Sequence, residues 1–388
     1  MKKKVLGVDK DIFLLGIVSM LTDISSEAIF SVFSIFFTVV LGASTALLGI
    51  VEGLADFSAS SLDYVAGFLS DKTGKRKWYS FIGYLFSTIA KSLLIIANVA
   101  SAAIFRITER LGKSFRGPPR DAWIAAIAKK TNRGFSFGVH SALDKSGAVI
   151  GPLLAYLFLS LVGQSVSSFR LLFILVLIPA VLSIFVIMMI KDKPSAPVKR
   201  EKIFSRSSFQ NLNPEFKHFL RASAIFSLAY FSFGFLMLKA YIIGFSIKDV
   251  VLLYALFNLS FVIFAVPIGK LGDMIGRKKI IALEYTLYLL MSIGFIFAFS
   301  KVHVILLFIV FGIFFAIDDS QSKAYIVDMA RSKRATAIGV YNLVIGLVYV
   351  PASIIAGILW AYNPNYAFIF AAIVSLASLM YFLFGKKR

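Results

Sequence analysis

The sequence predicts an all-α membrane protein with twelve transmembrane helices, arranged as two pseudo-repeats of six helices each. Three observations predict this fold class: apolar runs of membrane-spanning length, Lys and Arg residues that gather in alternate gaps, and a motif that recurs 202 residues later. Of the 388 residues, 59% are hydrophobic and 16% are charged. A soluble domain would be about half apolar and a quarter charged.

The apolar runs set the number of spans, because a bilayer core about 30 Å thick requires about 20 helical residues. The runs are continuous and lack the ten-residue alternation of barrel strands, which excludes a transmembrane β-barrel. The expected spans are 12–40, 45–70, 78–98, 101–127, 134–161, 168–190, 219–243, 247–269, 280–300, 303–325, 335–360 and 366–384.

The basic residues orient these spans. With the N-terminus inside, 28 of the 41 Lys and Arg residues fall in cytoplasmic gaps or tails, against three outside: Arg170, Lys248 and Lys301. The positive-inside rule therefore predicts that both termini are cytoplasmic. The start "MKKKVLGVDKDIFLLGIVSML" has no small-residue cleavage site, so we interpret it as a tail entering the first span. Because the net charge of +21 is spread over short gaps, nucleic-acid binding is not expected.

The longest polar gap divides the chain into an N-terminal half at 1–191, a cytoplasmic linker at 192–217 and a C-terminal half at 218–388. The stretch "GFLSDKTGKRK" at 67–77 aligns with "GKLGDMIGRKK" at 269–279. Two six-span halves of this kind predict a transporter that works by alternating access, with a substrate site near the bilayer midplane.

The first copy resembles the loop 2–3 signature of the major facilitator superfamily, G-x-x-x-D-[KR]-x-G-[KR]-[KR], and the second departs from it only at Met274. The resemblance implies the major facilitator fold and a gate in which Asp71 holds the cytoplasmic side closed, with Arg116 or Arg120 as its partner. Gly67 would permit close approach of helices, and Gly74 a tight turn. The gating residues expected from both copies are Asp71, Arg76, Arg116, Arg120, Asp273 and Arg277.

A second pattern lies on span 5, where Gly138, Gly147, Gly151 and Pro152 resemble most of the family's antiporter motif, G-x(8)-G-x(3)-G-P-x(2)-G-G. Its last two glycines are replaced by Ala155 and Tyr156. Glycines on one face allow span 5 to pack closely on a neighbouring helix. The resemblance implies export in exchange for protons.

Charged residues inside the spans form helical stripes, such as Asp23 and Glu27 at i, i+4. An ionisable group at the membrane centre costs at least about 2.5 kcal/mol, so it must be paired or reach water. The first half balances eight acids against seven bases. Spans 1, 2, 4 and 5 carry nearly all of them, and the resemblance implies that spans 1 and 4 line the cavity while spans 3 and 6 face lipid.

Two sets of candidate residues follow from these stripes. The expected proton-coupling residues are Asp23, Glu27, Asp56 and Asp144, since the proton affinity of a carboxylate changes when its partner moves away. The expected substrate-cavity residues are Arg106, Glu109, Arg110, Lys113 and His140. The family's span 4 motif, R-x-x-q-G, is only partly met from Arg106 onward, and Pro118 and Pro119 are expected to interrupt this helix.

The function predicted from these features is proton-coupled secondary transport, with export of small organic molecules, in a monomer of the cell membrane. Aromatic residues in the second half favour an amphipathic or lipophilic substrate. Uptake or exchange of an anionic metabolite and a substrate-sensing receptor remain as alternatives. The absence of cysteine, of a phosphate-binding loop and of an H-E-x-x-H pair argues against an enzyme, a metal site and a cofactor.

Overall fold

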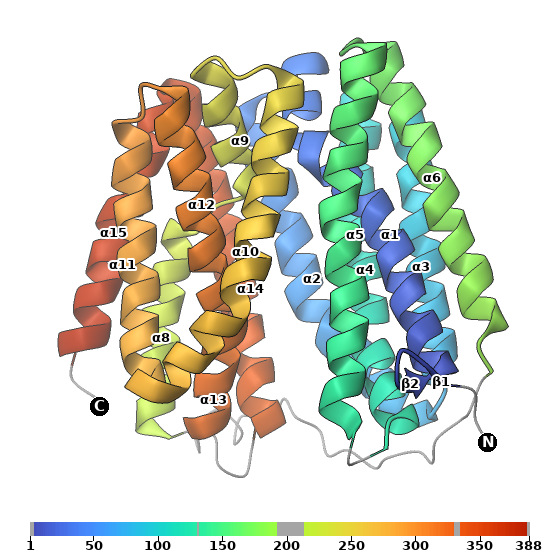
Figure 1. The fold of residues 1–388 in the computed structure, drawn as a ribbon. Coiled ribbons are helices and arrows are strands. Elements are labelled where there is room, and N and C mark those ends of the chain that lie inside the picture. The colour runs from blue at the N-terminus through green and yellow to red at the C-terminus, as the bar shows by residue number, and fades with distance from the viewer. Residues whose placement is uncertain (1–3, 130–131, 192–212, 330–333, 386–388) are drawn as a thin grey trace. The chain divides into compact units, whose positions relative to one another are not determined.

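The computed structural model describes residues 4–129, 132–191, 213–329 and 334–385, and it is built almost entirely of helices (Figure 1). A short antiparallel hairpin of β1 (Lys4–Val5) and β2 (Val8–Asp9) precedes the first helix. The Asp9 carboxylate caps that helix by accepting a hydrogen bond of 3.0 Å from the backbone N–H of Asp11.

Every expected span coincides with helical structure, which confirms the predicted fold class. The first six spans are α1 (Lys10–Ile35) with the π-helix η1 (Phe36–Val40), α2 (Thr45–Thr73), α3 (Arg76–Ser92) with η2 (Leu93–Ile96), α4 (Val99–Ile127), α5 (Arg133–Val162) and α6 (Val166–Met189). The other six are α8 (Pro214–Ala229) with α9 (Phe233–Ile242), α10 (Ile247–Ile275), α11 (Arg277–Ile296), α12 (Lys301–Ile317) with η4 (Asp318–Ser322) and α13 (Lys323–Met329), α14 (Arg334–Tyr362) and α15 (Pro364–Phe384). Within the described ranges, ten segments are apolar enough to cross a membrane by composition, and the charged α2 and α4 are not among them.

The chain forms two compact units. The first unit comprises Met1–Gly42, Ser58–Glu201 and Ile247–Ala255, and the second comprises Ala43–Phe57, Lys202–Ser246 and Leu256–Arg388. The beginning of α2 thus packs with the second unit, and the beginning of α10 packs with the first. Most of the expected linker lies outside the described residues, since the structure describes only 213–217 of it.

The same helix pairs recur in both units. In the first unit α1 packs on α5 and α6, and α3 packs on α4 and α6. In the second unit α8 packs on α14 and α15, and α11 packs on α12 and α15. These contacts match at corresponding positions of the two six-helix repeats, so the internal repeat of the sequence is also a repeat of packing.

Two expectations about helix continuity are wrong. Helix α4 continues through Pro118 and Pro119, where an interruption was expected. A proline pair removes only two backbone hydrogen-bond donors. When a membrane helix packs against neighbouring helices, those neighbours compensate for the lost hydrogen bonds. Conversely, span 7 is broken between α8 and α9 at Tyr230–Ser232. The Tyr288 hydroxyl donates a hydrogen bond of 2.9 Å to the carbonyl of Ala229. This bond satisfies one of the backbone carbonyl groups that have no partner within the helix at its end.

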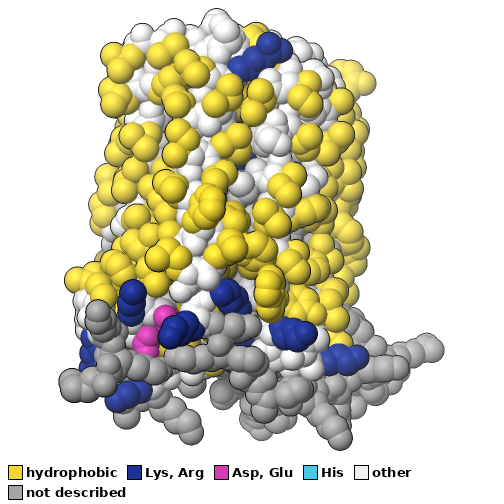
Figure 2. All heavy atoms as spheres, turned by 90° about the vertical axis from the view of Figure 1, so that its right-hand side faces the viewer, with side chains coloured by type: hydrophobic (Ala, Val, Ile, Leu, Met, Phe, Trp, Pro, Cys, Tyr) yellow, Lys and Arg dark blue, Asp and Glu magenta, His cyan; other side chains and the backbone are white. Residues whose placement is uncertain are grey.

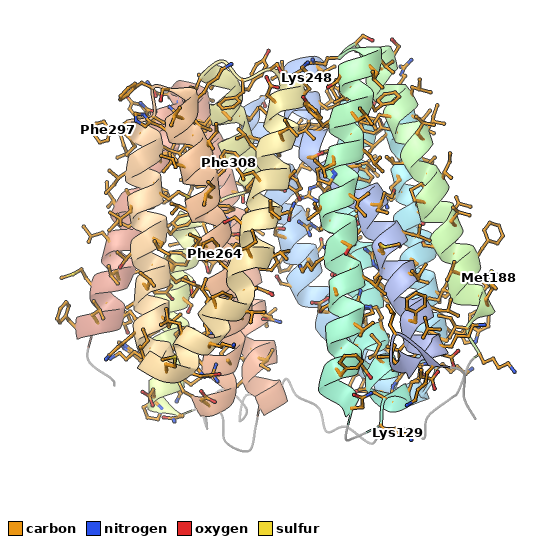
Figure 3. All side chains as sticks on the ribbon, in the orientation of Figure 1. Lys129, Met188, Lys248, Phe264, Phe297 and Phe308 are labelled. Atoms are coloured by element: carbon orange, nitrogen blue, oxygen red, sulfur yellow. The ribbon has the colours of Figure 1, made fainter. Side chains whose placement is uncertain are left out.

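Exposed apolar side chains cover one side of the first unit. Figure 2 shows hydrophobic side chains over the middle of this face, with Lys and Arg gathered at its lower edge. Helix α6 supplies several of them, including Phe185 and Met188, and Met188 points outward in Figure 3. Helix α3 also exposes an apolar face, but its other face is buried and carries Lys91, which is 0% exposed. Span 3 is therefore lipid-facing on one side only.

Candidate functional site

Glycines on α5 bring α1 and α5 into direct backbone contact. A Cβ added at Gly147 would collide with the carbonyl oxygen of Met20, and one at Gly151 would lie 2.5 Å from the carbonyl oxygen of Ile24. The close packing expected of span 5 therefore occurs at Gly147 and Gly151. Gly138 is different, because nothing lies within 4 Å of its added Cβ, and its expected packing role is wrong. Pro152 lies within α5, which remains a continuous helix.

The same close approach brings two carboxylates together. A Cβ at Gly147 would lie 3.1 Å from the Cβ of Asp23, and Asp144 stands one helical turn before Gly147 on α5. Asp144 and Lys113 are the charged groups that act most strongly on Asp23. Asp144 in turn forms an ion pair of 3.6 Å with the Arg120 guanidinium. Two acids and two bases from α1, α4 and α5 thus form one interior cluster, which we call the Asp23–Asp144 cluster.

The Ser19 hydroxyl joins two neighbouring side chains, Tyr84 and His140, to Arg120 of this cluster. It lies 3.1 Å from the Tyr84 hydroxyl and 3.0 Å from Nε2 of His140, and it accepts a hydrogen bond of 3.0 Å from Arg120. His140 is 3% exposed. His140 therefore belongs to a buried hydrogen-bond network rather than to an accessible cavity wall in this structure.

Arg120 is the central cation of the network, and its removal should be costly. We expect Arg120→Ala to lower the free energy of unfolding by about 2 kcal/mol, because the Asp144 carboxylate, whose side chain is only 21% exposed, would lose this partner. The double variant Arg120→Ala/Asp144→Asn should recover part of that loss. Thermal unfolding of the purified protein in detergent measures both. Asp121, which also pairs with Arg120 but is 53% exposed, provides the control, since Asp121→Asn should change little. Equal losses in the single and double variants would contradict this account.

Glu27 has a separate partner. The Tyr254 hydroxyl, from the beginning of α10, donates a hydrogen bond to Oε2 of Glu27, and both residues belong to the first unit. Glu27 is 8% exposed and Tyr254 is 9% exposed. A buried carboxylate on α1 is therefore joined to a helix of the second sequence repeat by this hydrogen bond.

Glu109 and Lys91 occupy the interior next to these acids. Both are 0% exposed, and Glu109 Oε1 accepts hydrogen bonds from Ser87 at 3.3 Å and Ser26 at 3.5 Å. Glu109 is the charged group that acts most strongly on Lys91, and Asp23 and Glu27 also act on it. Lys91 thus places a buried amino group in the same network of acids.

Two of the remaining cavity candidates, Arg106 and Arg110, lie around Phe30. The guanidinium carbons of Arg106 and Arg110 lie 4.5 Å and 5.4 Å from the Phe30 ring centroid. Arg110 and Lys113 are partly exposed, whereas Arg106 is 6% exposed. Of the five expected substrate-cavity residues, Arg110 and Lys113 are therefore the ones that this structure leaves accessible.

The first copy of the loop motif forms a local ion pair. Nη2 of Arg76 lies 3.6 Å from Oδ1 of Asp71, and Gly74 between α2 and α3 has φ +70°. The two arginines expected as the gate partner contact other groups: Arg120 forms an ion pair with Asp144, and the Arg116 guanidinium lies 4.9 Å from the Tyr84 ring centroid. In this structure, Asp71 pairs within its own motif.

The second copy forms a wider network. Gly276, at the position equivalent to Gly74, has φ +92°. Arg277 forms ion pairs with Asp273 at 3.1 Å and with Asp328 of α13 at 2.6 Å. Asp328 was not predicted from the sequence, because it lies outside the motif, 51 residues after Arg277. The arginine of this copy thus connects α10, α11 and α13.

The second unit contains an aromatic cluster at the break between α8 and α9. The Tyr230 ring lies 5.7 Å from Tyr288, 5.8 Å from Phe314 and 5.4 Å from Tyr349. Tyr230 and Tyr349 are partly exposed. Asp56 belongs to the part of α2 that packs in this unit, and it acts electrostatically on Tyr349. Asp56 and this aromatic cluster therefore belong to the same unit.

Comparison with known proteins identifies the family. A family model described as Major Facilitator Superfamily matches residues 15–301 and 222–388. The chain is 36% identical over 388 residues to an uncharacterized MFS-type transporter of Methanocaldococcus jannaschii, covering 97% of this chain and 95% of that protein. It is 24% identical over 338 residues to multidrug resistance protein 2 of Bacillus subtilis, covering 83% and 82% of the two chains.

Solved structures show the same fold. A peptide transporter POT in complex with sulfate superposes with a TM-score of 0.81 at 14% identity, covering 98% of this chain and 94% of that chain. The nucleoside transporter NupG superposes with a TM-score of 0.77 at 15% identity, covering 96% and 98%. The chain belongs to the major facilitator superfamily and is a multi-pass secondary transporter of the membrane.

Proposed function

We propose that this transporter exports small organic molecules in exchange for protons, by alternating access. The observation that carries the proposal is the Asp23–Asp144 cluster, in which two carboxylates from adjacent helices share the cation Lys113 and Asp144 is also paired with Arg120. An acid buried inside a membrane protein must be paired, hydrated or protonated. A cluster whose two acids compete for one cation can therefore take up a proton when one pair separates.

Proton binding at Asp23 would change the balance of this cluster. Once Asp23 is neutral, Lys113 of α4 interacts with one carboxylate fewer, and the contact between α1 and α4 weakens. Because Gly147 and Gly151 hold α1 against α5, the change is transmitted through a rigid helix pair. A coupling free energy of 1–3 kcal/mol between sites is typical and corresponds to about 5–150-fold in affinity.

The aromatic cluster around Tyr230 supports an organic substrate. Its partly exposed rings and the interrupted helix next to them are typical of a transporter binding site, where non-helical backbone lines a cavity. The relative named as a multidrug resistance protein supports export of such molecules. We further propose that the chain acts as a monomer in the cell membrane, with both termini cytoplasmic and with its repeats at 1–191 and 218–388 joined by the linker at 192–217.

A second candidate is uptake or exchange of an anionic metabolite. It is favoured by Arg106 and Arg110, whose guanidinium groups converge on Phe30, together with the partly exposed Lys113. A planar anion could stack on the same ring while it binds the guanidinium groups. The two candidates differ in substrate charge and in the direction of proton movement.

Proteoliposomes with an acidic lumen and an entrapped pH dye distinguish these functions. We expect added ethidium to raise the internal pH by exchanging for protons, with initial rates that saturate with concentration. A dicarboxylate such as succinate tests the anionic candidate in the same vesicles, and a nucleoside and a dipeptide test substrates of the kinds transported by its structural neighbours. If none of these compounds moves protons while labelled ethidium exchanges, the proton coupling is refuted. If only succinate is transported, the export of lipophilic molecules is refuted.

A further inference from the structure

The first unit carries an exposed tryptophan where α3 begins and α6 ends. Trp78 lies in the first turn of α3 and is 53% exposed. It starts a stripe of exposed apolar residues along α3 that includes Ile82 and Ile89. In the last turn of α6, Met188 and Met189 are also exposed. Because α3 packs on α6, the two helices present neighbouring apolar surfaces to the membrane.

A lysine holds the two helix ends together. Nζ of Lys77 donates hydrogen bonds of 3.1 Å to the carbonyl oxygen of Met188 and of 2.6 Å to that of Ile190. The last carbonyl groups of a helix have no partner within it, and a nearby Lys side chain can bind them. Lys77 precedes Trp78, so these bonds place the tryptophan and the exposed methionines on one surface.

Exposed lysines surround this surface. Lys72 lies in the last turn of α2, Lys75 precedes α3, and Lys191 follows the end of α6; all three are exposed. Asp71, the acid of the same loop, is partly exposed and forms an ion pair of 3.6 Å with Arg76. Figure 2 shows Lys and Arg side chains at the lower edge of the apolar face. Positive charge therefore borders the apolar surface at this edge.

This combination of side chains fits the boundary between the acyl chains and the headgroups of a lipid leaflet. An indole ring places its apolar body among acyl chains and its N–H among headgroups, which is why Trp is enriched at membrane interfaces. Lysines next to the membrane attract anionic headgroups. A zwitterionic lipid, which has no net charge, would gain much less from the same lysines. The chemistry therefore favours an anionic phospholipid.

We propose that this surface is a binding site for an anionic phospholipid. The lysines contact the headgroup phosphate, and the acyl chains lie on the exposed residues of α3 and α6. We call the site the α3–α6 rim, and it consists of Lys72, Lys75, Trp78, Met188, Met189 and Lys191. The inference goes beyond the proposed function, because a lipid can bind here whichever substrate is transported.

Quenching of tryptophan fluorescence by brominated lipids tests the α3–α6 rim. The chain has three tryptophans, and Trp123 and Trp360 are only 1% and 6% exposed. The full-length protein is reconstituted into vesicles of phosphatidylcholine that contain a minor share of brominated phosphatidylglycerol or, in parallel, an equal share of brominated phosphatidylcholine. We expect the phosphatidylglycerol to quench more strongly, with a relative affinity at least about fivefold higher. Trp78→Phe should abolish the difference, which assigns it to this residue.

Neutral variants show whether charge causes the preference. Lys72→Gln/Lys75→Gln/Lys191→Gln should quench almost equally with the two lipids. Sodium chloride at about 1 M should have the same effect on the unchanged protein, since it shortens the Debye length to about 3 Å. Arg170→Gln is the matched control, because it neutralises an exposed basic residue at the opposite end of α6 and should leave the preference intact.

Equal quenching of the unchanged protein by the two brominated lipids would overturn the proposal, and so would a preference that survives in the triple variant. Little quenching by either lipid would mean that another protein surface, such as a second copy of this chain, covers Trp78, and the lipid assignment would be wrong. The measurement involves neither substrate nor proton movement. A failure here is therefore distinguishable from a failure of the proposed export.

Discussion

Asp23→Asn should reduce proton-driven transport at least about tenfold while leaving substrate exchange without a gradient close to that of the unchanged protein. The reason lies in the Asp23–Asp144 cluster, where the Asp23 carboxylate is acted on by Asp144 and Lys113. Asparagine has nearly the same shape as aspartate but cannot bind or release a proton. Substrate binding and the movement of the helices are thereby preserved, and only the coupling is lost. Paired assays of gradient-driven uptake and of counterflow in proteoliposomes measure the two quantities separately.

Three further variants make the test specific. Asp11→Asn changes the same residue type in the first turn of α1, away from the cluster, and should leave both assays unaltered. Glu27→Gln and Asp56→Asn examine the other two expected carriers on α1 and α2. Coupling that survives unchanged in Asp23→Asn, Glu27→Gln and Asp56→Asn alike would refute the assignment of proton coupling to these acids. Size-exclusion profiles show whether each variant remains assembled.

The helices could be predicted from the sequence because their signal is local. Twenty apolar residues in a bilayer must form a helix, whatever surrounds them. The turn at Gly74 and its counterpart at Gly276 could also be predicted from the sequence, because glycine readily adopts the positive φ that a tight turn requires. Both residues have positive φ between two helices. The close packing at Gly147 and Gly151 was also predicted, but spacing alone could not show that Gly138 faces open space.

The partners of the charged residues could not be predicted in the same way. Tyr254 is one of 15 tyrosines, and its hydrogen bond to Glu27 joins residues 227 positions apart. The burial of Lys91 could have been predicted, because it is a lone charge in an apolar span. The expectation that span 3 faces lipid argued against such a buried position. The break at Tyr230–Ser232 has no proline or glycine within it. Aromatic packing and the hydroxyl of Tyr288 stabilise that break, and both come from helices distant in sequence.

Alanine substitutions on α5 should have opposite effects at Gly151 and Gly138. A methyl group at Gly151 would lie 2.5 Å from the carbonyl oxygen of Ile24 and 2.9 Å from the backbone nitrogen of Ala28. Both atoms belong to the α1 backbone, so whole helices must separate for the methyl group to fit. Overpacking of this kind costs typically 1–3 kcal/mol, and we expect Gly151→Ala to lose at least about 2 kcal/mol of stability.

Gly138→Ala is the matched control, because it makes the same change on the same helix where nothing lies within 4 Å. There the methyl group contacts nothing in the folded protein, and it lowers the conformational entropy of the unfolded chain. Alanine should therefore stabilise the helix by roughly 0.5–1 kcal/mol relative to glycine. Unfolding temperatures in detergent should therefore fall for Gly151→Ala and stay equal or rise for Gly138→Ala. If both variants are equally stable, α5 does not depend on its contact with α1. The glycines could then not be what holds Asp23 beside Asp144, and the proposed coupling would lose its structural basis.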